Sequence, residues 1–252
     1  MRISRRKFCG ITGGTVASLA FSNACRLNSN SAMKNNGRLF VRPHTPTGPR
    51  STGQVMLGLD RERDAILQLP KTAADSPLPL LVMLHGAGQS ADDMFWYLGT
   101  AHEEAGVAVL APNSRDHSWD AIRDDFGPDV DFLNRALERA LDSALIDPTR
   151  MAIGGFSDGA SYAVSLGLIN GDLFKKVVAF SPGFIIDGTP NGKPRFFISH
   201  GTNDRILSID RCGRRIATQL KARGYDVTFR EFDGGHEIPE PVAKEGLLAV
   251  VT

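Results

Sequence analysis

Short, fully apolar runs alternate with longer segments of helical periodicity along most of the chain. The run Leu80 to Leu84 is apolar at every position, which is typical of a strand buried on both faces of a parallel sheet. Similar runs predict strands at 107–111, 151–153, 177–180 and 196–199, and the alternating segment 225–232 predicts a last strand. Helical periodicity predicts helices over 91–105, 130–145, 157–169, 209–223 and 241–251.

The order of these segments sets the expected fold. Strands that alternate with helices give right-handed crossovers, and hence an α/β fold with a mostly parallel, doubly wound sheet. Before them, the apolar segments 54–59 and 64–69 flank a polar stretch, which predicts an antiparallel hairpin. Only residues 181–194, rich in Pro and Gly, separate the fourth and fifth of these parallel strands. This connection leaves no room for a cap domain.

The first residues differ from the rest of the chain. Met1 to Lys7 is basic, Phe8 to Phe21 carries no charge, and small residues follow at Ser22 to Ala24. This pattern predicts an export signal over residues 1–24, and Arg5-Arg6 ahead of a mildly apolar stretch is typical of the twin-arginine signal. The apolar stretch is shorter than the roughly 20 residues that span a bilayer. A periplasmic or extracellular protein is therefore expected.

Residues 25–53 are rich in Asn, Ser, Pro, Gly and Thr, with one brief apolar run. They predict a linker with at most one short edge strand, so that the folded domain occupies residues 54–252. Of the three cysteines, Cys9 and Cys25 lie in or beside the signal, which predicts no internal disulfide framework. Cys25 stands where a lipoprotein signal places its lipidated cysteine, so lipidation is an alternative to simple cleavage.

The composition and net charge limit the classes of partner that the protein is expected to bind. Hydrophobic residues make up 42% and charged residues 23% of the 252 residues, as in an ordinary compact domain. A formal net charge of +1 gives no broad basic surface for nucleic acid. A small molecule is therefore the expected partner. Membrane contact is expected only through the export signal or a lipid at Cys25, and the sequence leaves the oligomeric state open.

A glycine-flanked serine follows the strand at 151–153 and opens the next helix. The run Gly154-Gly155-Phe156-Ser157-Asp158-Gly159 has the strand, turn and helix context of a nucleophile elbow. Gly155 and Gly159 remove the side chains that would collide where strand and helix pack closely. A serine hydroxyl needs a base to take its proton, and this base needs a third group to orient it. Ser157 is the expected nucleophile.

The order along the chain selects the base and the acid. On such a sheet the nucleophile comes first, the acid second and the histidine last, each after a later strand. Asp204 follows the strand at 196–199, and His236 follows the last strand, so both are expected at the carboxyl edge of the sheet. Asp204 is alternatively a turn or helix-cap aspartate, in which case Asp210 is the acid. His200, at a strand end, is interpreted as structural.

Two backbone N–H groups are expected to hold the negative charge of a tetrahedral intermediate. They are those of Asp158, after the nucleophile, and of Ala87, in the glycine-rich loop after the strand at 80–84. The alternative for this loop is a phosphate-binding turn, but no G-x-x-x-x-G-K-[ST] pattern follows. Neither a metal nor a cofactor is expected. Four residues on loops at the same sheet edge are candidates for lining the substrate site or for ordinary packing: Trp119, Phe126, Phe184 and Ile206.

Five segments carry a resemblance to a known family: LHGAGQSADDM, GGFSDGASYA, AFSPGF, HGTNDRIL and FDGGHEIP, in this order. They resemble the bacterial phospholipase/carboxylesterase group of α/β-hydrolases, with kinship to polyhydroxybutyrate-depolymerase-like and dienelactone-hydrolase-like esterases. The resemblance runs from about Gln54 to the C-terminus. It implies hydrolysis of carboxylic esters without a cofactor, with Ser157, Asp204 and His236 in the catalytic roles. Several members have Gln after the serine, where this chain has Asp158.

Two other functions stay open on the sequence. The same triad cleaves amides in serine peptidases, although this chain has no additional specificity domain, and a hydrolase fold also serves as a non-catalytic binding protein. Without a cap, the site is expected to be an open cleft for short or accessible esters. The sequence therefore favours a serine esterase over both alternatives.

Overall fold

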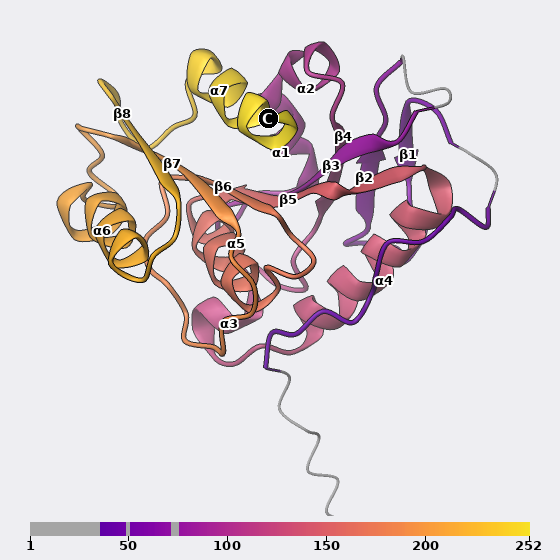
Figure 1. The fold of residues 1–252 in the computed structure, drawn as a ribbon, viewed down its shortest axis with the longest axis horizontal. Helices are drawn as coiled ribbons and strands as arrows, with labels where there is room; N and C mark the ends of the chain where they lie inside the picture. The colour runs from indigo at the N-terminus through magenta and orange to yellow at the C-terminus, as the bar shows by residue number, and fades with distance from the viewer. Residues whose placement is uncertain (1–35, 49–50, 72–75) are drawn as a thin grey trace, which may run out of the picture. The chain divides into compact units, whose positions relative to one another are not determined.

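An eight-stranded sheet runs through the middle of the computed structural model, which describes residues 36–48, 51–71 and 76–252 (Figure 1). The export signal predicted for residues 1–24 lies outside the described residues. The strand order is β1-β2-β4-β3-β5-β6-β7-β8. The strands are β1 (Gln54–Met56), β2 (Ala65–Gln68), β3 (Leu78–Leu84), β4 (Ala108–Pro112), β5 (Ile146–Phe156), β6 (Lys176–Phe180), β7 (Arg195–Gly201) and β8 (Val227–Phe232).

The pairing of the strands is the one expected from the sequence. From β4 to β8 every neighbouring pair is parallel. The hairpin of β1 and β2 adds to β4 in antiparallel fashion. The prediction of a mostly parallel sheet with an N-terminal antiparallel hairpin is confirmed.

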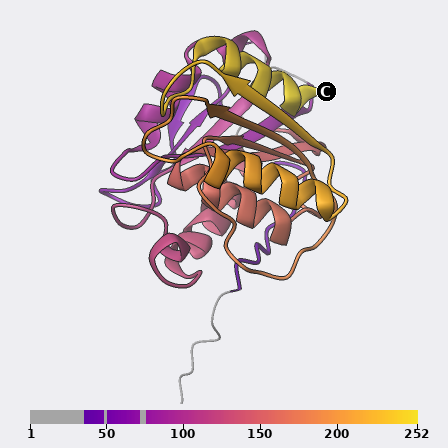
Figure 2. The same ribbon diagram turned by 90° about the vertical axis from the view of Figure 1, so that its left-hand side faces the viewer.

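Helices cover both faces of the sheet, as Figures 1 and 2 show. The core is accordingly divided into two apolar clusters, one on each face. Among the described helices, none has the length and apolar character that crossing a bilayer requires. One face carries α1 (Ala91–Leu98), α2 (Ala101–Glu104) and α7 (Glu240–Val251), and the other carries α4 (Pro128–Ser143), α5 (Asp158–Ile169) and α6 (Arg215–Ala222).

Two of the predicted helices are interrupted. The segment 91–105 is divided into α1 and α2 at Gly99, whose φ of 51° lies outside the helical region. The segment 209–223 begins with the π-helical turn η1 (Asp210–Arg214) before α6. In this turn Gly213 lies against His200, because a Cβ on Gly213 would be 2.7 Å from the Nδ1 atom of His200. Helical periodicity does not report such local breaks.

A further short helix, α3 (Asp120–Arg123), has no periodicity in the sequence. Side chains hold it in place instead. The Asp120 carboxylate accepts hydrogen bonds from the N–H groups of Gly127 and Asp129 and from the hydroxyl of Tyr162. The buried Asp129 carboxylate accepts hydrogen bonds from the backbone N–H groups of Arg115 and Asp120. Burial, together with the nearby charge of Asp120, raises the pKa of Asp129 to about 6.

The described part of the predicted linker belongs to the packed domain. Residues 36–48 form no strand, yet Leu39 is fully buried in the core beside α4 and α5. Asn170, also fully buried, fixes this segment: its Oδ1 accepts the N–H of Leu39 at 2.8 Å, and its Nδ2 donates to the carbonyl of Gly37 at 2.8 Å. Residues 36–48 thus pack onto the domain although the sequence predicts a linker here, because the distant amide side chains of Asn170 and Asn134 bond backbone groups that a strand partner would otherwise engage.

We expect Asn170→Ala to lower the free energy of unfolding by about 2–4 kcal/mol, because it removes the acceptor of the buried Leu39 N–H and a hydrogen bond to the Gly37 carbonyl. Urea denaturation measures this change. Asn134→Ala is the matched control. Its Oδ1 accepts the N–H groups of Phe40 and Val41 at a more exposed position, where water replaces the lost bonds. Equal losses in the two variants would contradict the role of Asn170.

Candidate active site

The backbone turns sharply at Ser157, between the end of β5 and the start of α5. Ser157 has φ 55° and ψ −116°, a conformation that L-residues rarely adopt. The strand and helix around it are in close backbone contact, since a Cβ on Gly155 would collide with Gly159, and one on Gly159 would collide with the carbonyl of Leu84. The predicted elbow is present, and both glycines are required by its packing.

The structure brings Ser157, His236 and Asp204 into one hydrogen-bonded row. The Ser157 hydroxyl donates to Nε2 of His236 at 2.8 Å, and Nδ1 of His236 donates to Oδ2 of Asp204 at 2.7 Å. The Phe156 ring lies against the imidazole, with 4.8 Å between ring centroids. Ser157 and His236 keep part of their surface open, whereas the side chain of Asp204 is fully buried.

Asp204 has a complete set of partners. Its Oδ1 accepts the backbone N–H groups of Ile206 and Leu207, both at 2.8 Å, and its Oδ2 accepts from His236. Burial alone would raise the pKa of Asp204, but the hydrogen bonds from His236, Leu207 and Ile206 outweigh it and keep this pKa below its ordinary value. Asp204 is therefore a turn aspartate and the partner of the histidine at once, and it is charged at neutral pH.

The loops that carry the acid and the histidine are tied to each other. The N–H of Asn203 donates to the carbonyl of Gly234 at 2.9 Å. A Cβ on Gly201 would lie 2.5 Å from the same carbonyl, so only glycine allows this approach. Asp210, the alternative acid, is directed elsewhere: it lies at the start of η1 with an exposed side chain that pairs with Arg214 at 2.7 Å.

The glycine-rich loop after β3 lies beside the nucleophile. A Cβ on Gly86 would be 3.4 Å from the Cβ of Ser157. Gln89 shapes this loop, because its Oε1 accepts the N–H of Gly86 at 3.0 Å and its Nε2 donates to the hydroxyl of Tyr97 at 3.0 Å. Within the described residues, no protein acceptor engages the N–H groups of Ala87 and Asp158. Both groups are available to bind an oxyanion.

The buried rings of His85 and Trp119 hydrogen-bond to the glycine-rich loop after β3 and to the residues beside it. His85 donates through Nδ1 to the carbonyl of Gly86 at 2.7 Å, and its Nε2 accepts the N–H of Ser114 at 3.0 Å. Burial lowers the pKa of His85, so its ring is neutral. The indole N–H of Trp119 donates to the carbonyl of His85 at 2.8 Å. Trp119 is fully buried and stacks on Tyr162.

The four candidate substrate-lining residues separate into two pairs. Trp119 and Phe126 are buried core residues, both packed on Tyr162, which is the packing alternative that the sequence left open. Their side chains pack between α3 and Tyr162 of α5, and the sequence did not predict the helix α3. Phe184 and Ile206 lie on the loops after β6 and β7, partly and largely exposed respectively. Only this second pair offers apolar surface at the carboxyl edge of the sheet.

Asp158 is tied to the loop that precedes α3. The hydroxyl of the buried Ser118 donates to Oδ2 of Asp158 at 2.7 Å. This bond fixes the first residue of α5 and turns its carboxylate toward residue 118. The N–H of Asp158 stays directed to the space beside Ser157, as its place in the first turn of the helix requires.

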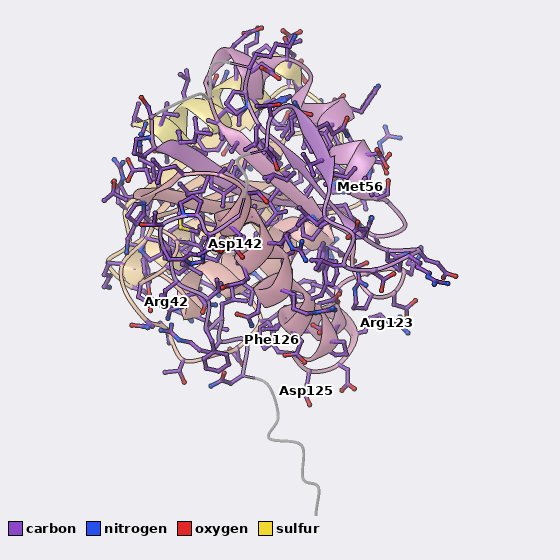
Figure 3. All side chains as sticks on the ribbon, turned by 90° about the vertical axis from the view of Figure 1, so that its right-hand side faces the viewer. Arg42, Met56, Arg123, Asp125, Phe126 and Asp142 are labelled. Carbon is purple, nitrogen blue, oxygen red and sulfur yellow. The ribbon has the colours of Figure 1, made fainter. Side chains whose placement is uncertain are left out.

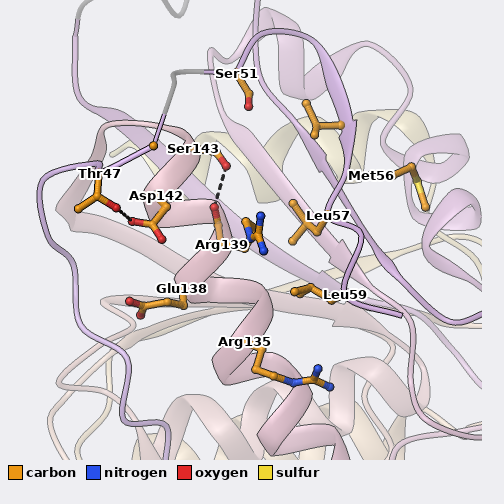
Figure 4. A pocket seen from close by; sticks show the side chains of 12 residues that line it. Thr47, Ser51, Met56, Leu57, Leu59, Arg135, Glu138, Arg139, Asp142 and Ser143 are labelled. Atoms are coloured by element: carbon orange, nitrogen blue, oxygen red, sulfur yellow. Dashed lines mark hydrogen bonds between the residues drawn. The ribbon is translucent and has the colours of Figure 1, made fainter. Parts of the chain in front are cut away.

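A cavity of about 540 Å³ lies away from these residues, between α4 and the N-terminal hairpin. Figure 3 shows its rim residues Met56 and Asp142 on the face that α4 and the hairpin share, and Figure 4 shows Arg135 and Arg139 beside the apolar hairpin. At its edge His44, Glu138 and Asp142 offer ligand atoms within 4.8 Å of one another. These groups are at least partly exposed, and His44 already bonds Asp142, so we assign no metal to them.

Several residues support the site although the sequence assigns them no role in it, and His200 was expected only to be structural. His85, Gln89 and Ser118 contact the loops around Ser157, and His200 lies 3.2 Å from Oδ2 of Asp204. The only signal in the sequence was the position of His85 and His200 at the carboxyl ends of apolar runs. That signal gives no partner, because each partner belongs to another strand or loop.

Comparison with known proteins extends the resemblance noted in the sequence. Residues 120–244 match the model of the phospholipase/carboxylesterase family. Acyl-protein thioesterase 1 of Aspergillus fumigatus is 31% identical over 141 residues, which are 50% of this chain and 58% of that protein. The probable feruloyl esterase C of Aspergillus terreus is 25% identical over 210 residues, which are 69% of this chain and 76% of that protein. The chain thus spans little more than half the length of the first relative.

Solved structures share the fold. The fluorophosphonate-binding serine hydrolase F of Staphylococcus aureus superposes with a TM-score of 0.64 at 18% identity, over 75% of this chain and 92% of that one. The shared fold and the strained serine at the carboxyl edge of the sheet show that this chain has the α/β-hydrolase fold.

Proposed function

We propose that the protein is a serine hydrolase that cleaves carboxylic esters through an acyl-enzyme. The observation that carries this proposal is the hydrogen-bonded row from Ser157 through His236 to Asp204, with two unengaged N–H groups beside the serine. The named relatives are thioesterases and esterases, which supports the same reaction class.

Acylation uses the groups already in contact. His236 Nε2 takes the proton of the Ser157 hydroxyl while Oγ bonds to the ester carbonyl carbon. The carbonyl oxygen becomes an oxyanion, held by the N–H groups of Ala87 and Asp158. The bond to the leaving oxygen then breaks, and His236 gives its proton to the departing alcohol. Asp204 stays ionised and stabilises the imidazolium throughout.

Deacylation repeats these steps with water. Water gives a proton to His236 Nε2, and its oxygen attacks the acyl carbon. The same two N–H groups hold the second oxyanion, and the bond to Ser157 Oγ breaks as the proton returns to the serine. The carboxylic acid leaves. The buried Asp204 keeps the imidazole in the tautomer that both halves of the reaction need.

Ester hydrolysis is favoured over the two alternatives by the surroundings of the site. A peptidase on this triad would need a surface that holds an extended peptide, and residues 181–194 add neither a helix nor a strand beside Ser157. A non-catalytic binding protein would have no need of the strained conformation at Ser157, whose energetic cost is typical of functional sites. We further propose that substrates are short-chain or otherwise accessible esters.

We also propose that the protein is exported by the twin-arginine route and works in the periplasm or outside the cell. The basic, apolar and small-residue regions of residues 1–24 support this proposal. Lipidation of Cys25 is its alternative form. Export of an already folded chain suits a domain whose described cysteine, Cys212, is free and buried.

The triad assignment predicts the following losses. Ser157→Ala should lower kcat by about 10⁶-fold, His236→Ala nearly as much, and the double variant no further, because the residues act as one unit. Asp204→Asn should cost about 10⁴-fold by favouring the wrong tautomer of His236. Hydrolysis of p-nitrophenyl acetate measures these changes. Asp210→Asn is the control and should keep its activity; a reversal of the two aspartate results would show that the acid is misassigned.

The missing cap predicts the dependence on acyl length. Each buried methylene is worth roughly 0.8 kcal/mol, so a deep apolar tunnel would raise kcat/KM with every added carbon. In an open cleft the later carbons stay in water. We expect activity on p-nitrophenyl esters to peak between about two and six acyl carbons and to show no rise at a lipid interface. A kcat/KM that continues to increase up to the palmitate ester would contradict this expectation. The Ser157→Ala variant serves as the control for hydrolysis without enzyme catalysis.

The export signal predicts that Arg5→Lys combined with Arg6→Lys leaves the precursor in the cytoplasm, because the pair of arginines defines this signal. Immunoblots of cell fractions measure this. Arg2→Lys keeps the pair and should export normally. Unchanged export of the double variant would exclude the twin-arginine route, and the mass of the mature N-terminus would show whether Cys25 carries lipid.

A further inference from the structure

A second histidine contacts the acid of the triad. His200, at the end of β7, and Asp204 both have fully buried side chains, and Nε2 of His200 lies 3.2 Å from Oδ2 of Asp204. The same nitrogen lies 2.7 Å from the carbonyl oxygen of Leu207. Oδ2 of Asp204 is the atom that binds His236. This carboxylate oxygen therefore contacts two imidazoles, that of the catalytic His236 and that of His200.

The contacts fix the tautomer of His200. A carbonyl oxygen and a carboxylate oxygen can only accept, so Nε2 must carry the hydrogen. Nδ1 is buried without a partner, and Gly213 closes the space beside it, since a Cβ there would be 2.7 Å away. Burial lowers the pKa of His200, even against its contacts with Leu207 and Asp204, so the ring is neutral and has one hydrogen to donate.

We propose that His200 is a positioning residue, which acts through Asp204 by donating its Nε2 hydrogen between the Leu207 carbonyl and the carboxylate oxygen that binds His236. This inference rests on the proposed hydrolase function. The Leu207 peptide also donates its N–H to Oδ1 of Asp204, so His200 closes the turn that holds the acid. Asp204 is thus held by neutral donors, which leave its charge for the imidazolium of His236.

The donor also affects how strongly Asp204 stabilises the protonated form of His236. Without the His200 hydrogen, Asp204 presents more negative charge to His236 and stabilises its protonated form more strongly. Activity needs neutral His236, so the acid limb of kcat/KM would move to higher pH. The other titratable groups around His200 are His236, the thiol of Cys212 on η1 and Glu231 on β8, and Glu231 is neutralised by Arg214. None of these residues is substituted in the variants below.

Two amide substitutions separate the donor from the volume of the side chain. Glutamine places its NH₂ group near the position of Nε2, whereas asparagine reaches only the position of Nδ1. We expect His200→Asn to lower kcat by about ten- to hundredfold with KM changed less than about twofold, and to move the acid limb upward by about half a unit or more. His200→Gln should restore most of kcat and the wild-type limb. His102→Asn, at a buried histidine on α2, is the control and should change neither.

Two further measurements decide the matter if His200→Asn does not fold. Gly213→Ala places a methyl group against Nδ1 and displaces an unchanged imidazole from Asp204, so it should lower kcat and move the limb in the same direction. In the wild-type protein, ¹⁵N shifts of the His200 ring should show hydrogen on Nε2 and a bare Nδ1. Hydrogen on Nδ1 would overturn the inference, as would equal losses in His200→Gln and His200→Asn.

The proposed function and this inference fail differently. A wild-type protein that does not hydrolyse p-nitrophenyl acetate, or a Ser157→Ala variant that still does, counts against the proposed function. The role of His200 alone would be rejected by a different result. In that case the wild type is active, Ser157→Ala is inactive, and a folded His200→Asn variant keeps the wild-type kcat and acid limb.

Discussion

The backbone at Ser157 is held at a positive φ because strand β5 and helix α5 approach each other through glycines on both sides of the serine. Gly155 and Gly159 leave no room for a methyl group against each other or against the Leu84 carbonyl. This close packing prevents the turn from relaxing. It also places the Ser157 hydroxyl above the sheet and the N–H of Asp158 beside it, so the direction of attack and one oxyanion donor follow from the same constraint.

The remaining site residues are arranged around that fixed serine by the ends of parallel strands. Loops after β3, β7 and β8 reach it from the carboxyl edge of the sheet, which Figure 1 shows as a continuous layer between helices. The loops of the acid and the histidine hydrogen-bond to each other through Asn203 and Gly234. Distances of 2.7 and 2.8 Å along the row thus depend on backbone contacts, which are stiffer than surface side chains.

Buried neutral histidines stabilise two of these loops. His85 bonds the Gly86 carbonyl and the Ser114 N–H, and His200 stands between the Leu207 carbonyl and Asp204. In both, burial lowers the pKa, so each ring is an uncharged donor at neutral pH. A protonated ring at position 200 would compete with the imidazolium of His236 for Asp204, whereas a neutral ring orients the loop without changing the balance of charge.

The sequence by itself determined the order of strands and helices, the antiparallel hairpin and the elbow around Ser157, because these follow from periodicity and from glycines within a few residues of one another. Tertiary structure alone decided the rest. It brought Asp204 rather than Asp210 to His236, placed Trp119 and Phe126 in the core, and packed residues 36–48 onto the domain through Asn170. Each of these outcomes depends on a hydrogen bond or contact between residues far apart in the chain, and no local pattern specifies a distant partner.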